Sequence, residues 1–98
     1  MASFVQIIEF STSRIDEVRA LGEQMQSQRE AGTALRGMVC ADRDRPNHYF
    51  NVVEFDSYES AMENSNRPET TEFASKMRAL CDGAPVFRNL DVLETWSR

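Results

Sequence analysis

The stretch RPNHYFNVVEFDSYESAMENSNRPETTEF, residues 45–73, carries the clearest structural signals in this chain. Its run HYFNVVEF, residues 48–55, has the β-branched and aromatic composition of a strand. In DSYE, Asp56 can accept from a first-turn amide while Glu59 reaches back, which is the capping-box pattern of a helix start. Pro68 has no backbone N–H and disfavours helical geometry at Arg67, so the helix is predicted to break there.

Upstream, two more strands flank a helix. SFVQIIEFS, residues 3–11, predicts a strand with apolar side chains on both faces. Apolar residues then recur at helical spacing, with Ser13 as the predicted N-cap and Gly32 as the predicted stop. TALRGMVCA, residues 33–41, predicts a strand, in which Gly37 indicates a bulge or a close approach by a neighbouring group.

Downstream, a second helical piece is predicted to begin at Pro68, a residue suited to a first-turn position, and to end at Gly83. Phe73, Met77 and Leu80 form its apolar stripe. PVFRNLDVLETW, residues 85–96, predicts the last strand.

This order predicts an α+β, ferredoxin-like βαββαβ fold with a four-stranded antiparallel sheet and helices on one face. The other face is then uncovered, and either register of the third strand leaves apolar side chains on it: Phe50 and Val52, or Tyr49, Val53 and Phe55. We therefore expect a homodimer that pairs through sheet faces. Residues 1–98 are expected to form a single domain.

Composition narrows the class of partner. The chain is 41% hydrophobic and 28% charged, which is typical of a folded globular domain. A net charge of −5 argues against nucleic acid and anionic membrane as partners. No secretion signal or membrane span is recognisable, so a cytoplasmic location is expected.

The two cysteines, Cys40 and Cys81, lie far apart in sequence and are expected to be buried, reduced thiols. Together with the single histidine they are too few and too scattered for a structural zinc site. No metal site is predicted.

The third strand and the helix after it resemble the corresponding segment of the dimeric α+β barrel superfamily, and more narrowly the antibiotic-biosynthesis-monooxygenase-like domains. The resemblance rests on Glu54, Phe55, Ser57, Glu59 and Phe73. It implies a homodimer with a pocket between sheet and helices in each subunit. It also implies a cofactor-independent monooxygenase acting on a small planar or aromatic substrate, because such substrates form a stabilised carbanion that meets oxygen directly.

Departures from the family pattern limit this inference. Many monooxygenase-like members have a histidine in the second helix, where this chain has Asn64 and Ser65. The haem-degrading branch uses Asn, Trp and His at positions that fall on or near Gln6, Asn64 and Met77, and none matches in type. We therefore expect neither haem nor any other cofactor.

Three residues of the third strand are candidate catalytic residues. His48 is the only side chain with an ordinary pKa near neutrality, although it is also simply the first residue of a strand. Tyr49 and Asn51 share the strand face of Phe55, which leads into the helix and so is predicted to face the pocket. Their alternative role is that of ordinary core residues.

The substrate-binding residues are predicted to be Gln6, Asn64, Ser65, Phe73 and Met77. For Asn64 and Ser65 the alternative is capping at the helix break, and for Met77 it is core packing. The missing helix histidine leaves a second hypothesis open, that of a non-catalytic homodimer that binds a small ligand or serves as an assembly module.

Overall fold

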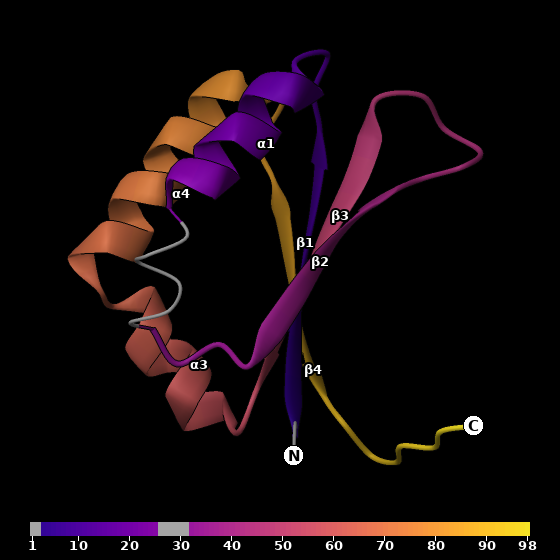
Figure 1. Cartoon of the computed structure of the whole chain (residues 1–98), viewed down its shortest axis with the longest axis vertical. Coiled ribbons are helices and arrows are strands. Elements are labelled where there is room, and N and C mark those ends of the chain that lie inside the picture. The colour runs from indigo at the N-terminus through magenta and orange to yellow at the C-terminus, as the bar shows by residue number, and fades with distance from the viewer. Residues whose placement is uncertain (1–2, 26–31) are drawn as a thin grey trace.

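The computed structural model describes residues 3–25 and 32–98 and has the predicted order of elements (Figure 1). The elements are β1 (Phe4–Ser11), α1 (Ile15–Gln24), β2 (Arg36–Ala41), β3 (His48–Phe55), α3 (Tyr58–Ser65), α4 (Pro68–Leu80) and β4 (Val86–Asp91). The third strand has the predicted bounds, and the second helix breaks before Pro68 as predicted.

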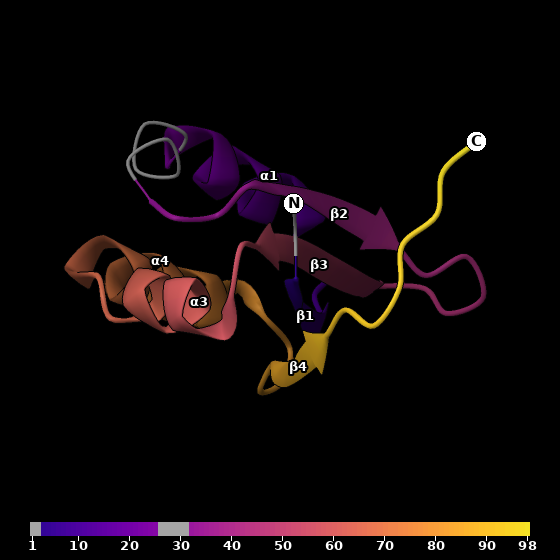
Figure 2. The same ribbon diagram turned by 90° about the horizontal axis from the view of Figure 1, so that it is seen from below.

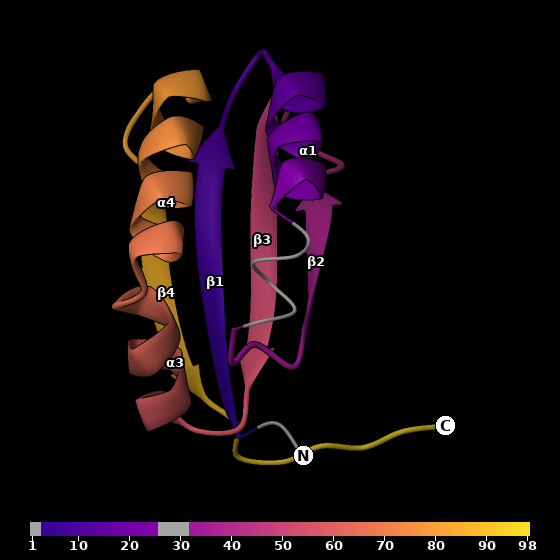
Figure 3. The ribbon, with the colours of Figure 1, turned by 60° about the vertical axis from the view of Figure 1, so that its left-hand side comes forward.

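The four strands form one antiparallel sheet in the order β2-β3-β1-β4. The helices lie together on one side of this sheet (Figure 1). Figure 3 shows α1 in front of β2 and β3, and α4 in front of β1 and β4. The predicted α+β, ferredoxin-like fold is therefore confirmed.

Strand register decides which side chains face the helices. Phe4 is paired with Phe55 and Phe10 with Tyr49, and Phe4, Phe10 and Phe55 are all buried. By alternation, Asn51 shares the helix-facing side with Tyr49 and Phe55, as the sequence predicted. The opposite side, which we call the open face, carries Val5, Ile7, Glu9, Met38, Cys40, His48, Phe50, Val52, Val86 and Leu90.

The core consists of two separate clusters under the helices. One contains Phe10, Val18, Leu21 and Met77, and the other contains Phe4, Phe55 and Ala61. The first cluster joins α1 and α4 to one end of β1, and the second joins α3 to its other end. The middle of the sheet lies between them.

Three predicted helix ends are wrong. Helix α1 begins at Ile15 without a side-chain cap from Ser13, because the hydroxyl of Thr12 takes the N–H of Arg14 instead. Helix α3 is capped by Ser57, which accepts from the N–H of Ser60, rather than by Asp56. Helix α4 ends at Leu80, before Gly83, because Cys81 already has extended backbone geometry.

The predicted continuation of the first helix to Gly32 crosses residues 26–31, which lie outside the described part of the chain. The strand predicted at residues 33–41 begins only at Arg36. In this strand, a Cβ on Gly37 would lie 3.2 Å from the backbone oxygen of Val52, so the prediction of a close approach is confirmed.

The prediction of two buried thiols is wrong for Cys40, which is exposed on the open face, while Cys81 is partly buried. Burial, and then the nearby charge of Asp82, raise the pKa of the Cys81 thiol. Both cysteines are free.

The last strand is shorter than predicted. Its final residue, Asp91, is paired with Phe4, the first residue of β1, and past it only one further hydrogen bond follows, from the N–H of Val92 to the carbonyl of Ser3 at 2.9 Å. The segment after it leaves the sheet on the side away from the helices (Figures 1 and 2). Leu93 and Trp96 in this segment are 96% and 86% exposed.

Thr12 forms hydrogen bonds with the start of α1 and with the end of α4. Its side chain is fully buried, donates to the carbonyl of Leu80 at 2.6 Å and accepts from the N–H of Arg14 at 2.9 Å. Thr12→Val removes both hydrogen bonds and leaves those backbone groups unpaired, so we expect the free energy of unfolding to fall by about 1–3 kcal/mol. Urea denaturation measures this loss, and Thr12→Ser, which keeps the hydroxyl, should retain most of the stability; equal losses in both variants would contradict this account.

Among the helices of the described residues, none combines the length and apolar character needed to cross a membrane.

Candidate functional site

A cavity of about 780 Å³ lies between the helix-facing side of the sheet and helices α1 and α4. Its walls include Phe10 and Met77 from one core cluster, Phe55 from the other, and Val53, which packs against the second cluster. The cavity thus lies between the two core clusters. Its volume is within the range of small-molecule sites.

The walls are mainly apolar. Ile8 and Val53 contribute from the two central strands, Val18 from α1, and Phe73 and Met77 from α4. Met77 is only 5% exposed and belongs to a core cluster, so its thioether both packs in the core and borders the cavity. Such walls suit a planar apolar molecule.

Asn51 is a polar group at the centre of the sheet. It lies in the middle of β3, between Ile8 of β1 and Val39 of β2, and lines the cavity. Its side-chain amide makes no hydrogen bond to any described residue. A half-buried amide without a protein partner can donate to and accept from a molecule in the cavity.

Two further amides border the same space. The Oδ1 atom of Asn64 accepts from the N–H of Thr33 at 3.4 Å, which leaves the amide nitrogen without a bond to the described residues. The Nε2 atom of Gln6 donates to Asn89 Oδ1 at 3.2 Å, so Gln6 is already partly satisfied. Asn51 and Asn64 are therefore the better placed hydrogen-bond donors.

Charged residues lie at three places on the cavity wall, one of which is Arg36 at the start of β2. Arg19 and Glu23 come from α1 and are exposed. Arg67 and Glu69 come from the junction of α3 and α4, where a guanidinium nitrogen lies 3.7 Å from a carboxylate oxygen. The sequence interpretation missed Arg67 because it treated the residue before Pro68 only as a helix break.

Three predicted site residues lie elsewhere. Tyr49 faces the helices, but its ring stacks on Phe10 with centroids 5.7 Å apart, within the core and outside the cavity wall. Ser65 is exposed at the end of α3 and does not line the cavity. His48 lies on the open face, opposite the cavity.

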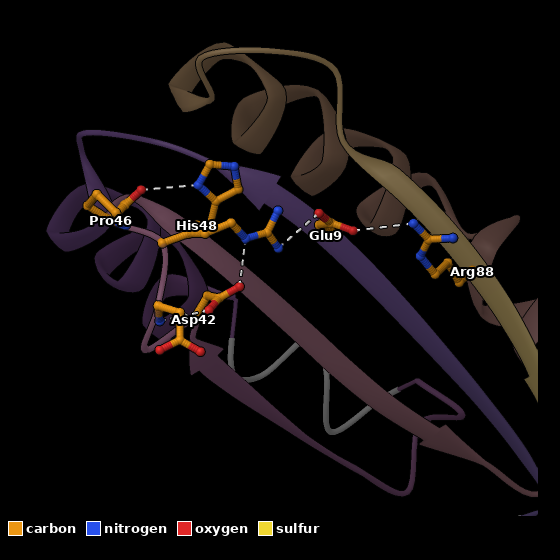
Figure 4. Close-up of polar contacts among 7 residues, drawn as sticks. Glu9, Asp42, Pro46, His48 and Arg88 are labelled. Atoms are coloured by element: carbon orange, nitrogen blue, oxygen red, sulfur yellow. Dashed lines mark hydrogen bonds and ion pairs between the residues drawn. The ribbon is translucent and has the colours of Figure 1, made fainter.

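On the open face, His48 belongs to a polar group at one end of the sheet (Figure 4). Its Nδ1 atom lies 3.1 Å from the carbonyl oxygen of Pro46. Nearby, Glu9 forms ion pairs with Arg88 at 3.4 Å and Arg45 at 3.5 Å. The N–H of Asp44, and then the Arg45 guanidinium, lower the pKa of Asp42.

Within residues 3–25 and 32–98, no group of three or more His, Cys, Asp or Glu side chains is close enough together to hold a metal ion. The cavity wall formed by these residues contains no histidine, cysteine or tyrosine. The described wall therefore offers amides, two carboxylates, guanidinium groups and the hydroxyl of Thr70 for chemistry.

No family model matches the sequence, and no curated protein matches it significantly. Solved structures do match. SnoaB from Streptomyces nogalater, a cofactor-independent oxygenase, aligns over 100% of both chains with a TM-score of 0.83 at 14% identity. A structure described as an antibiotic biosynthesis monooxygenase aligns over 93% of this chain and 99% of its own, with a TM-score of 0.75 at 15% identity.

A conserved protein from Methanosarcina mazei Go1 also aligns, over 93% of both chains, with a TM-score of 0.81 at 10% identity. Full-length superposition at such low identity establishes a common architecture and leaves chemistry to the site. The resemblance noted in residues 45–73 is thus confirmed at the level of structure, and this chain has the α+β fold of the antibiotic-biosynthesis-monooxygenase-like proteins.

Proposed function

We propose that this protein is a cofactor-independent monooxygenase that oxidises a small planar aromatic substrate in the cavity between sheet and helices. The observation that carries the proposal is the side-chain amide of Asn51, which faces a largely apolar cavity of about 780 Å³ without a hydrogen-bond partner among the described residues. The fold shared with SnoaB, a cofactor-independent oxygenase, supports the same reaction class.

The proposed reaction needs a substrate with a CH₂ group that lies between two aromatic rings and is conjugated through them to a carbonyl. Loss of one proton to solvent water gives a delocalised carbanion, which transfers electrons to dioxygen and forms a C–O bond. The resulting peroxide anion takes up a proton, and the hydroperoxide so formed eliminates water, leaving a ketone. One oxygen atom of O₂ enters the product and the other becomes water.

The protein's part in this reaction is to bind and orient. Asn51 and Asn64 donate hydrogen bonds to the substrate oxygens and stabilise the negative charge that develops there. Phe73 and the other apolar wall residues hold the rings and limit access of water. No step is assigned to His48, because its side chain lies on the opposite face of the sheet.

Oxygen uptake tests the proposal. Wild-type protein is mixed with a panel of hydroxylated polycyclic aromatic compounds, anthrones included, and uptake is compared with the rate in buffer alone. The proposal expects at least one compound to be oxidised faster than in buffer. Uptake at the buffer rate across the panel would overturn it.

The alternative is a non-catalytic protein that binds a ligand of the same kind. The observation in its favour is that the described wall contains no histidine, cysteine or tyrosine to act as a general base. Tight binding of a panel compound without oxygen uptake would select this alternative.

We also propose that the protein forms a homodimer through its open face. Apolar side chains occupy the middle of this face, Val86 and Met38 are 45% and 51% exposed, and no described element covers it. Glu54 and Arg36 lie at one end of it and Glu9 at the other, while Arg88, which is paired with Ile7 on the edge strand β4, reaches Glu9 at 3.4 Å. Burial of such a face is a sufficient driving force for a stable dimer.

Val52→Glu places a charge in the middle of the open face, between Ile7 of β1 and Met38 of β2. We expect this variant to have the mass of one chain, 11.2 kDa, in light scattering, while wild type has twice that mass. Ala74→Glu, which adds the same charge on the exposed side of α4, is the matched control and should stay dimeric. A monomeric wild type would refute the proposed interface.

A further inference from the structure

Gln6 is a half-buried amide of β1 that lines the cavity. It is paired with Val53 of β3 on one side and with Asn89 of the edge strand β4 on the other. Directly paired residues of antiparallel strands point to the same side of a sheet, so the side chains of Gln6 and Asn89 are neighbours on the helix-facing side. Asn89 itself is exposed and lies outside the described cavity wall.

A hydrogen bond between these two side chains orients the amide of Gln6. Its Nε2 atom donates to Asn89 Oδ1 at 3.2 Å, which turns the nitrogen end of the amide toward β4. The other end, Oε1, makes no hydrogen bond to residues 3–25 and 32–98. An amide oxygen accepts hydrogen bonds and donates none. Gln6 therefore presents a free acceptor, while its donor end is held by a residue outside the wall.

We infer that Asn89 is a positioning residue that makes Gln6 the acceptor of the cavity and so favours aromatic ligands with a hydrogen-bond donor, a hydroxyl or an amine. The inference rests on the proposed function, because it takes the cavity to be the ligand site. Asn89 acts through Gln6 and does not touch the ligand. Gln6 is the specificity-determining residue that accepts from the ligand.

Gln6 and Asn51 lie close enough to bind one ligand together. Asn51 is paired with Ile8, two residues along β1 from Gln6 and on the same side of the sheet. Diagonal neighbours of this kind are typically about 7–8 Å apart, within reach of long side chains. A planar ligand that lies across β1 and β3 receives a hydrogen bond from Asn51 at one oxygen and donates one to Gln6 from another group. Two such contacts fix its orientation within its own plane.

Fluorescence titration with aminoanthracene and anthracenecarbaldehyde, substituted at the same ring position, tests the role of Gln6. Both compounds are neutral at neutral pH; the aromatic amine is mainly a donor and the aldehyde is only an acceptor. Gln6→Leu removes the amide at similar size and gives the preference of the remaining wall. We expect the ratio of the two affinities in wild type to favour the amine by about 3–10-fold more than in Gln6→Leu, the effect of one hydrogen bond.

Two substitutions of Asn89 test its positioning role. Asn89→Asp offers only acceptors, so it keeps Nε2 of Gln6 at β4 and should preserve the preference for the amine. Asn89→Arg offers only donors, so it binds Oε1 instead and turns Nε2 toward the cavity. The ratio should then shift toward the aldehyde, to or beyond the Gln6→Leu value. Both substitutions are at an exposed position on the side opposite the open face.

The outcomes separate the inference from the proposed function. Equal ratios in wild type and Gln6→Leu would overturn the acceptor role of Gln6 while leaving the cavity as a ligand site. Equal ratios in Asn89→Asp and Asn89→Arg would overturn the positioning role of Asn89, since a merely structural effect would not distinguish a donor from an acceptor. Binding of neither compound to wild type would defeat both the inference and the aromatic cavity on which it rests.

Discussion

Asn51→Ala is expected to lower kcat for oxidation of a panel substrate by about 10²–10³-fold, the effect typical of removing one preorganised hydrogen-bond donor from a site of developing negative charge. The amide of Asn51 has no hydrogen bond to the described residues, so its loss removes no bond on which the fold depends. The measurement is steady-state oxygen uptake, with urea denaturation of the same preparation.

Asn66→Ala is the matched control for this experiment. Asn66 is exposed, caps the C-terminal end of α3 and does not line the cavity. Its variant should keep wild-type kcat. If Asn51→Ala leaves kcat unchanged, or if kcat falls equally in both variants, Asn51 has no specific role in the proposed site.

Phe55→Ala is expected to reduce the free energy of unfolding by about 3–5 kcal/mol, the usual effect of removing a buried aromatic ring. The ring is only 2% exposed and belongs to the core cluster with Phe4 and Ala61. Since small domains are stable by only about 5–15 kcal/mol, this loss is a large part of the total. The midpoint of urea denaturation measures it, at constant m-value.

Phe55→Leu keeps most of the buried volume and should lose markedly less stability than the alanine variant. A small loss for Phe55→Ala would mean that the cluster of Phe4, Phe55 and Ala61 is not an essential part of the core. Phe55 contributes to the cavity wall as well as to the core. Comparing the leucine and alanine variants therefore shows how much of the stability depends on filling the volume of this side chain.

The sequence predicted the order of elements because its signals there are local and strong. The composition of residues 48–55 indicated a strand, and Pro68 fixed the break between α3 and α4. The link between Phe55 and the following helix also identified the side of β3 that carries Asn51. These features depend on neighbours in sequence, so a single chain is enough to read them.

Element ends depend on partners that are distant in sequence, and there the predictions failed. Strand β4 stops at Asp91 because β1 begins at Phe4, eighty-odd residues away. Helix α1 starts after Thr12, whose hydroxyl bonds to Leu80 of α4 as well as to Arg14. No local pattern indicates either constraint.

The candidate site shows the same division. Alternation placed Tyr49 and Asn51 on one face, but only the packing of Phe10 decides that Tyr49 is in the core while Asn51 borders the cavity. Arg67 was missed because its position on the wall follows from how α3 and α4 meet. A charged residue beside a proline has no sequence signal for that role.

Oxidation under isotopically labelled dioxygen tests the central claim most directly. The substrate is the panel compound with the highest wild-type rate, and mass spectrometry follows the label in product and water. A cofactor-independent monooxygenase predicts one labelled oxygen atom in the product and one in water, at a rate well above that in buffer and strongly reduced in Asn51→Ala. Label incorporated no faster than in buffer, or equally fast in wild type and Asn51→Ala, would contradict the proposed activity of this cavity.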